Sequence, residues 1–138
     1  MKTPDEVRQE LVRRWLTRAE EDLAVANQLL TDDVPYFGAI GYHAQQAAEK
    51  FMKAFLVSRQ IEFPKTHDLL QLIEIIRPAD DKLADALKTS AILSDYGVET
   101  RYPGDLPELS RHDATNAAAL AAGVRILVER ALLDPTEI

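Results

Sequence analysis

The chain has 138 residues, of which 46% are hydrophobic and 28% are charged, so residues 1–138 are expected to form a single globular domain. It has no cysteine, which excludes disulfides, thiolate metal sites and a cysteine nucleophile. Its formal net charge of −7 makes it a poor general binder of nucleic acid, so any phosphate contact requires a local basic patch.

The sequence carries no signal for a membrane or for export. Its first residues lack the apolar stretch of a signal peptide, and no apolar run approaches the roughly 20 residues that a membrane helix needs. The absence of cysteine suits a reducing compartment. We therefore expect a cytoplasmic protein without a membrane partner.

Apolar residues recur at steps of three and four in the first half of the chain, which predicts two long helices. The first is expected over residues 3–30, with Pro4 in its first turn as a start signal. The second is expected over residues 36–59. The predicted apolar faces are Val7, Leu11, Trp15, Ala19, Leu23, Ala26 and Leu30 in the first helix, and Ala44, Ala47, Ala48, Phe51, Phe55 and Leu56 in the second.

The second half of the chain predicts three further helices and one long loop. Two helices are expected over residues 66–76 and 80–93, and the first of them ends before Pro78 because the residue preceding a proline avoids the helical region. An ordered loop is expected over residues 94–109, which hold two glycines and two prolines. No segment alternates like a half-buried strand, so the predicted fold is all-α, an up-and-down bundle of four or five helices.

The last helix is predicted over residues 110–133. Ser110 and Asp113 have the spacing of a capping box at its start. Residues 117–124 are rich in alanine, which permits close approach of a second helix. We interpret this stripe as core, because any bundle needs one, and the alternative is a seam between two copies of the chain.

A polar stripe also follows the second predicted helix. His43, Gln46, Lys50 and Lys53 are spaced by three, four and three residues, so they lie within a sector of roughly 80°. Two ammonium groups, an amide and an imidazole could reach one ligand from this face. The alternative is a solvated face on which Glu49 and Lys53 form an i,i+4 ion pair.

A second group of polar residues stands at the predicted start of the third helix. Lys65, Thr66, His67 and Asp68 would meet the backbone N–H groups and the positive dipole end there, which favour an anion. Thr66 is the expected N-cap. The alternative is that Thr66 and Asp68 only satisfy the helix end.

The long loop holds Arg101 and Tyr102, followed by a proline and a glycine. An arginine beside an aromatic ring could stack on a base or clamp a phosphate. It could equally pack the loop onto the bundle by pairing with a buried acid. Both interpretations stay open, because long ordered loops are often functional.

The residues described so far resemble a HEPN domain, the higher eukaryotes and prokaryotes nucleotide-binding family. The resemblance extends over about residues 15–132, and its most specific parts are the second-helix segment at 42–50 and the Lys-Thr-His-Asp segment at 65–68. The residues that carry it are Trp15, Ala19, Asp22, Leu23, Ala26 and Leu30, residues 42–50 and 53–56, residues 63–69, and residues 101–103.

The resemblance implies a helical bundle that is often a homodimer, in a cytosolic protein commonly encoded beside a minimal nucleotidyltransferase. Such a pair would form a two-component, toxin–antitoxin-like system, and nucleotide or RNA binding is implied as well. Some family members are metal-independent ribonucleases, with an Arg followed four to six residues later by a His. This chain departs from that pattern, because Arg111 and His112 are adjacent and the other Arg–His pairs are too far apart.

We therefore expect a binding or interaction module and assign no catalytic residue. The expected ligand-binding residues are His43, Gln46, Lys50, Lys53, Lys65, Thr66, His67, Arg101 and Tyr102. The three histidines lack metal-ligand spacing, so no metal and no cofactor is expected. Two alternatives remain, an endoribonuclease toxin and a dimeric scaffold without a ligand.

Overall fold

A computed structural model describes residues 1–97 and 108–133, and these residues form helices without any strand. This confirms the predicted all-α bundle. The elements are the α-helices α1 (Pro4–Thr31), α2 (Phe37–Ser58), α3 (Leu69–Ile76), α4 (Asp81–Leu87) and α5 (Arg111–Leu133), and the 3₁₀ helix η1 (Lys88–Tyr96).

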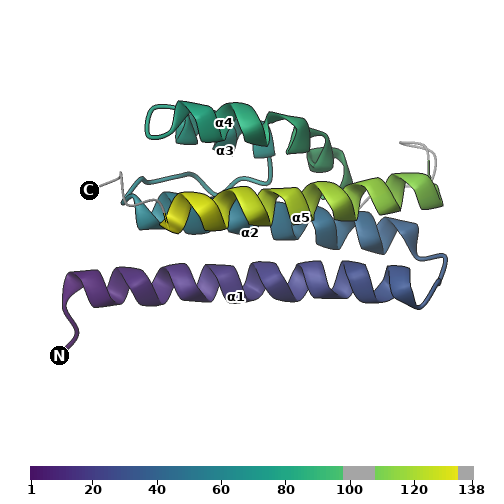
Figure 1. Ribbon diagram of the computed structural model, residues 1–138, viewed down its shortest axis with the longest axis horizontal. Coiled ribbons are helices and arrows are strands. Elements are labelled where there is room, and N and C mark those ends of the chain that lie inside the picture. The colour runs from purple at the N-terminus through teal and green to yellow at the C-terminus, as the bar shows by residue number, and fades with distance from the viewer. Residues whose placement is uncertain (98–107, 134–138) are drawn as a thin grey trace.

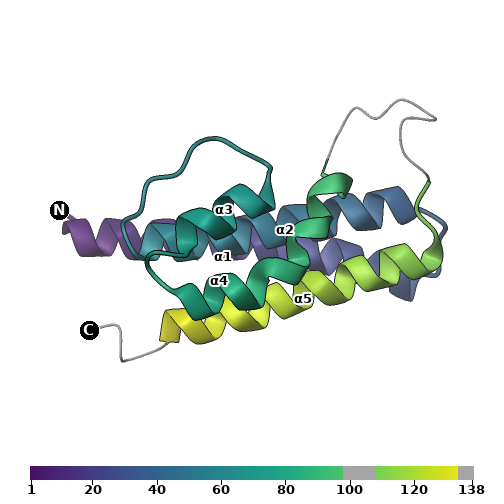
Figure 2. The ribbon, with the colours of Figure 1, turned by 90° about the horizontal axis from the view of Figure 1, so that it is seen from above.

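The helices are stacked in three layers (Figure 1). Helix α1 forms one outer layer, α2 and α5 lie side by side in the middle, and α3 and α4 form the other outer layer (Figures 1 and 2). Helix α2 runs antiparallel to α1, and α5 lies beside α2 and runs in the same direction as α2. Because α2 contacts α1, α3, η1 and α5, its side chains decide how the layers fit together.

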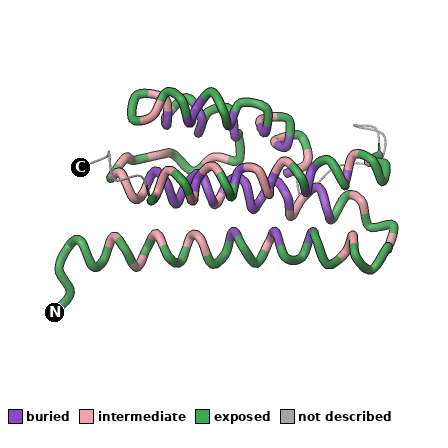
Figure 3. The backbone as a smooth tube through the Cα atoms, in the orientation of Figure 1, coloured by how far each residue is buried: buried purple, intermediate pink, exposed green. Residues whose placement is uncertain are grey.

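The core is centred on α2, which is purple along most of its length in Figure 3. All six predicted apolar residues of α2 are fully buried, which confirms the predicted inward face. Small side chains make the close approach possible, because Ala44, Ala47 and Ala48 leave room for neighbouring helices. Larger side chains such as Phe51 and Phe55 fill the remaining space.

The alanine stripe of α5 lies in this core. Ala117, Ala118, Ala121 and Val124 are all buried within the single chain. Burial within one chain confirms the interpretation as core, because a dimer seam would leave these side chains exposed in an isolated copy. The apolar face of α1 is buried only in part, since Val7 and Leu11 remain 44% and 43% exposed.

Two helix starts follow the sequence signals closely. The hydroxyl of Thr3 accepts a hydrogen bond from the backbone N–H of Glu6, and Pro4 opens α1. At α5 the Ser110 hydroxyl accepts from the Asp113 N–H, while the Asp113 carboxylate accepts from the Ser110 N–H. These reciprocal bonds confirm the predicted capping box.

Two predicted boundaries are wrong. The third helix begins at Leu69 rather than at residue 66, with Asp68 and not Thr66 as its N-cap. The fourth helix is an α-helix only to Leu87 and continues as a 3₁₀ helix. There the Ser90 hydroxyl donates to the carbonyl of Leu87. This side-chain bond competes with a backbone N–H group that would otherwise bond that carbonyl in an α-helix.

Candidate functional site

The polar stripe of α2 is buried at Gln46 and Lys53 and partly exposed at His43 and Lys50. Lys53 and Gln46 are only 7% and 9% exposed, so the expectation of a solvated surface is wrong for these two residues. Carboxylates from α1 and α2 neutralise its cations. The stripe therefore belongs to two ion clusters, a partly buried one centred on Asp22 and a buried one centred on Glu49. The predicted i,i+4 ion pair between Glu49 and Lys53 is confirmed.

The first cluster joins α2 to α1. One oxygen of Asp22 lies 2.9 Å from Nδ1 of His43, and the other accepts a hydrogen bond from Lys50 Nζ at 2.5 Å. A carboxylate only accepts, so Nδ1 of His43 carries the donated proton. Two of the predicted ligand-binding residues, His43 and Lys50, are thus joined to the same acid of α1.

The second cluster joins α2 to the segment before α3. The carboxylate of Glu49 lies 2.8 Å from Lys53 Nζ, 2.8 Å from His67 Nδ1 and 3.0 Å from Gln45 Nε2. Its side chain is 4% exposed and that of Lys53 is 9% exposed, whereas that of His67 is 73% exposed. A buried carboxylate therefore fixes the orientation of a histidine that faces solvent.

Aromatic rings enclose the ammonium of Lys53. Its Nζ lies 5.5 Å from the centroid of the Trp15 ring and 5.8 Å from that of Phe63. The two rings meet edge to face, with centroids 6.4 Å apart. Cation–π attraction and the ion pair with Glu49 together compensate the burial of this charge.

Amide side chains extend the Glu49 cluster. Gln45 donates to the backbone carbonyl of His67 as well as to Glu49, and Gln46 donates to the Gln45 oxygen at 2.7 Å. Gly97 leaves room for this arrangement, because a Cβ there would lie 2.5 Å from the Gln45 side chain. Gln46, a predicted ligand-binding residue, is therefore part of the internal network.

Burial raises the pKa of the Glu49 carboxyl, but hydrogen bonds from Lys53, His67 and Gln45 outweigh burial and hold its pKa below its usual value of 4.5. A carboxyl with a depressed pKa stabilises the fold above its unfolded pKa, and this stabilisation is lost as pH falls through the folded pKa.

The contribution of Glu49 to stability should accordingly be constant near neutral pH and decline below about pH 4.5. Urea unfolding of the wild type and of Glu49→Gln between pH 3 and 7 checks this expectation. The difference in unfolding free energy should narrow toward low pH, because both side chains are then uncharged. A difference that is independent of pH would contradict it.

The turn before α3 is satisfied by its own side chains. The hydroxyl of Thr66 accepts from the Asp68 N–H, and the Asp68 carboxylate accepts from the Leu70 N–H. The Leu69 N–H donates to the hydroxyl of Ser94, which lies 25 residues further along the chain. The backbone N–H groups of residues 68–70 are therefore bonded within the chain, whereas Lys65 is exposed, so an anion here would meet side chains rather than these three donors.

Arg101 and Tyr102 lie outside the residues that the structure describes. Arg111, at the start of α5, forms an ion pair with Asp33, and its guanidinium carbon lies 5.2 Å from the centroid of the Phe37 ring. His112 is exposed beside it. In the part of the chain that the structure covers, no group of three or more His, Cys, Asp or Glu side chains is arranged to hold a metal ion.

Sequence reasoning missed two partners of the stripe, Asp22 and Gln45. A signal for Asp22 was present, because it lies beside Leu23 and one turn from Ala19 and Ala26 on the apolar face of α1. A carboxylate on an inward-facing side of a helix needs a cation from a neighbouring element as its partner, because burial of an unpaired charge is costly. For Gln45 the signal was its i,i+4 spacing to Glu49, whereas its bond to the carbonyl of His67 comes from a distant segment and had no local signal.

The fold and its buried charge clusters define an all-helical bundle protein with a polar seam along its central helix. A family model of the HEPN domain matches residues 12–131, and the chain belongs to this family. No protein in a search of curated proteins matched the chain. None of the helices described, across residues 1–97 and 108–133, is both long and apolar enough to cross a membrane.

A solved structure supports the same fold. The chain is similar to the protein TT1696 from Thermus thermophilus, with 28% sequence identity and a TM-score of 0.73. The similarity covers 86% of this chain and 96% of TT1696, so nearly the whole of that protein has a counterpart here.

Proposed function

We propose that the chain is a HEPN-type binding module that engages the phosphates of a nucleotide or RNA ligand and acts with a minimal nucleotidyltransferase. The observation that carries the ligand half of this proposal is the His67 side chain, which is 73% exposed while Glu49 holds its Nδ1. The opposite ring nitrogen, Nε2, then faces away from the carboxylate and can meet a ligand. Exposed Lys65, two residues earlier, adds a cation.

The positions of Arg111 and His112, and the contacts of Arg111, favour ligand binding over catalysis. A ribonuclease of this kind needs an arginine and a histidine that reach one phosphodiester together. Adjacent residues on a helix point about 100° apart, and Arg111 is already paired with Asp33 and stacked against Phe37. These contacts support a module that recognises its ligand without cleaving it.

The partner half of the proposal rests on family membership over residues 12–131. A nucleotidyltransferase encoded beside this chain would form with it a two-component, toxin–antitoxin-like system in the cytoplasm, and the chain would act as a homodimer. Coexpression of the two neighbouring genes and copurification check the partnership. Light scattering of the purified chain checks the dimer, and a monomer at micromolar concentration would contradict it.

Calorimetric titration with ATP and GTP tests the ligand half. Two charge-assisted hydrogen bonds, from Lys65 and His67, contribute about 3–6 kcal/mol in sum, which corresponds to dissociation constants near the millimolar range or somewhat below. The double substitution Lys65→Ala/His67→Ala should weaken binding at least about tenfold, because it removes both donors.

A matched control is Lys82→Ala/Lys88→Ala, which removes two exposed cations from α4 and η1 and should leave affinity unchanged. No heat at millimolar ATP or GTP would overturn the ligand half of the proposal. Cleavage of RNA without added metal, lost in Arg111→Ala or His112→Ala, would instead establish the endoribonuclease alternative.

A further inference from the structure

Gln45 of α2 is a fully buried side chain in which both polar atoms of the amide are bonded. Its exposed fraction is 0%. The amide nitrogen donates to Oε1 of Glu49 at 3.0 Å and to the backbone carbonyl of His67 at 3.2 Å, while the amide oxygen accepts from Gln46 at 2.7 Å. A carboxylate and a carbonyl only accept, so the orientation of the amide is fixed by its partners. Turning it would leave buried polar groups unsatisfied.

Gln45 meets His67 by two routes. The first is the direct bond to the His67 carbonyl. The second passes through Glu49, because Nδ1 of the His67 ring lies 2.8 Å from the same carboxylate oxygen, Oε1, that accepts from Gln45. The main chain and the ring of His67 are therefore both held by groups that Gln45 bonds, although the His67 side chain is 73% exposed.

Gly97, at the end of η1, lies against the amide of Gln45. A Cβ atom at position 97 would lie 2.5 Å from Cδ, 2.6 Å from Oε1 and 2.9 Å from Cγ of Gln45, all closer than a carbon atom can approach them unless something moves. The φ angle of Gly97 is −87°, a value that any L-residue adopts. Glycine is therefore needed at this position for the space that Gln45 occupies rather than for its backbone conformation.

The backbone around Gly97 is held in place. Its N–H donates to the carbonyl of Ser94 at 3.3 Å, and the Ser94 hydroxyl accepts from the Leu69 N–H at 2.9 Å. A methyl group at position 97 would therefore displace the Gln45 amide, the end of a side chain with rotatable bonds, rather than the backbone. The displaced amide would no longer bond both of its present acceptors.

We infer that Gln45 is a positioning residue that couples Gly97 to the orientation of the His67 imidazole. A side chain at position 97 turns the Gln45 amide away, and the His67 carbonyl and Oε1 of Glu49 each lose a donor. The ring is then held less firmly. The coupling itself needs no ligand, whereas its effect on affinity rests on the proposed function, in which Nε2 of His67 meets the ligand.

Nitrogen NMR of the histidine rings tests the coupling in the ligand-free chain. In protein with isotope-labelled histidine at about pH 8, an imidazole is uncharged, and Nδ1 of His67 carries the proton because it donates to Glu49. The two ring nitrogens then give well-separated signals, which their loss in His67→Gln assigns. In Gly97→Ala and in Gln45→Ala the separation should decrease, because a loosely held ring exchanges its proton between the two nitrogens.

A double variant shows whether the coupling runs through Gln45. Gln45→Ala removes all three atoms that a new Cβ at position 97 would meet. Gln45→Ala/Gly97→Ala should therefore give the His67 signals of Gln45→Ala alone. A further change in the double variant would overturn the proposal, in favour of a path through Ser94 and Leu69. Unchanged His67 signals in Gly97→Ala would overturn it as well, even if that variant unfolds more easily.

Two other glycines serve as matched controls, Gly38 in α2 and Gly123 in α5. A Cβ at either position would meet nothing within 4 Å. Gly38→Ala and Gly123→Ala should therefore leave the His67 signals as in the wild type. A shift in either control as large as that in Gly97→Ala would overturn a specific coupling.

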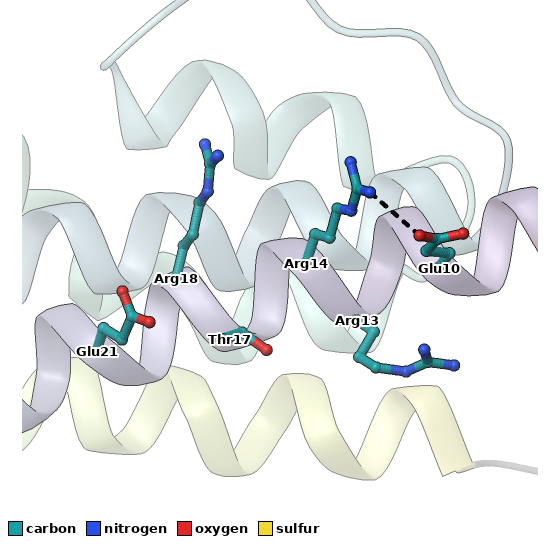
Figure 4. Close-up of a pocket in the computed structure, with 6 residues that line it drawn as sticks. All are labelled: Glu10, Arg13, Arg14, Thr17, Arg18 and Glu21. Carbon is teal, nitrogen blue, oxygen red and sulfur yellow. Dashed lines mark hydrogen bonds and ion pairs between the residues drawn. The ribbon is translucent and has the colours of Figure 1, made fainter.

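A third control lies on the outer face of α1. Figure 4 shows Arg14 and Arg18 extending from one side of this helix and Arg13 from the other. These arginines line an open hollow of about 490 Å³ with Glu10, Thr17 and Glu21. Arg14 is 69% exposed and pairs with Glu10 at 3.1 Å, so Arg14→Gln removes an ion pair that none of the bonds of Gln45 involves. Its His67 signals should be those of the wild type, and a shift would count against the coupling.

Calorimetric titration with ATP measures the effect on the proposed ligand site. Gly97→Ala should bind ATP about two- to tenfold more weakly than the wild type, the cost of ordering about one side chain on binding, whereas Gly38→Ala should bind it equally. A changed His67 signal with unchanged ATP affinity would support the coupling and overturn the contact of His67 with ATP. An unchanged signal would overturn the coupling and leave the proposed function standing, so the two failures are distinguishable.

Discussion

Replacing Glu49 with alanine is expected to lower the free energy of unfolding by about 3–5 kcal/mol. The side chain of Lys53 is 9% exposed, and the carboxylate of Glu49 is the counterion of its ammonium group. Without Glu49, a buried cation loses its counterion, and the amide of Gln45 and the ring of His67 lose an acceptor. Urea unfolding followed by circular dichroism at pH 7 measures the change.

Two further variants show whether the effect comes from a lost buried charge partner. The double substitution Glu49→Met/Lys53→Met removes both charges and should recover most of the lost stability, because apolar side chains of similar size replace buried ion pairs at little cost. Glu62→Ala removes an exposed carboxylate and should change stability by less than about 0.5 kcal/mol. If Glu49→Ala lowers the free energy of unfolding by no more than Glu62→Ala does, the buried cluster around Glu49 does not stabilise this region.

The inward faces of the long helices could be predicted because they depend on residues within one helix. Phe51 and Phe55 are placed by the same period as Ala44 and Ala48, and all four are buried. The start of α3 depends on a contact across the fold. Its first N–H, that of Leu69, donates to Ser94, and no local pattern identifies a hydroxyl 25 residues away as the partner.

In the candidate site, too, the features that depend on one helix could be predicted, and those that depend on contacts between helices could not. Periodicity on α2 places Lys50 and Lys53 in one sector but cannot say what covers that sector. Asp22 from α1 covers Lys50, whereas Trp15 and the segment around Phe63 cover Lys53. The stripe was therefore predicted as a set of residues, while its burial and its counterions depended on the packing of the layers.

This packing changes the role of the stripe. Side chains whose charge is compensated inside the bundle, such as Lys53, hold segments in place. Side chains fixed by the same clusters but exposed, such as His67, remain able to meet a ligand. Glu49 thus connects stability with the proposed function, since its loss should also release the orientation of the His67 ring.

The other large effect is expected from Phe51→Ala, which should lower the free energy of unfolding by about 3–5 kcal/mol. Phe51 is fully buried and lies in the middle of α2, the helix that contacts α1, α3, η1 and α5. Truncation leaves a cavity between layers, and backbones packed through small residues such as Ala47 cannot close it without losing other contacts.

Urea unfolding of Phe51→Ala alongside Leu70→Ala measures the cost of this cavity. Leu70 lies on α3 and is 45% exposed, so its truncation removes aliphatic surface without opening the core and should cost far less. An equal loss in the two variants would contradict a core centred on α2. A small loss in both would mean that the layers can close around position 51, and α2 would then not determine how they fit together.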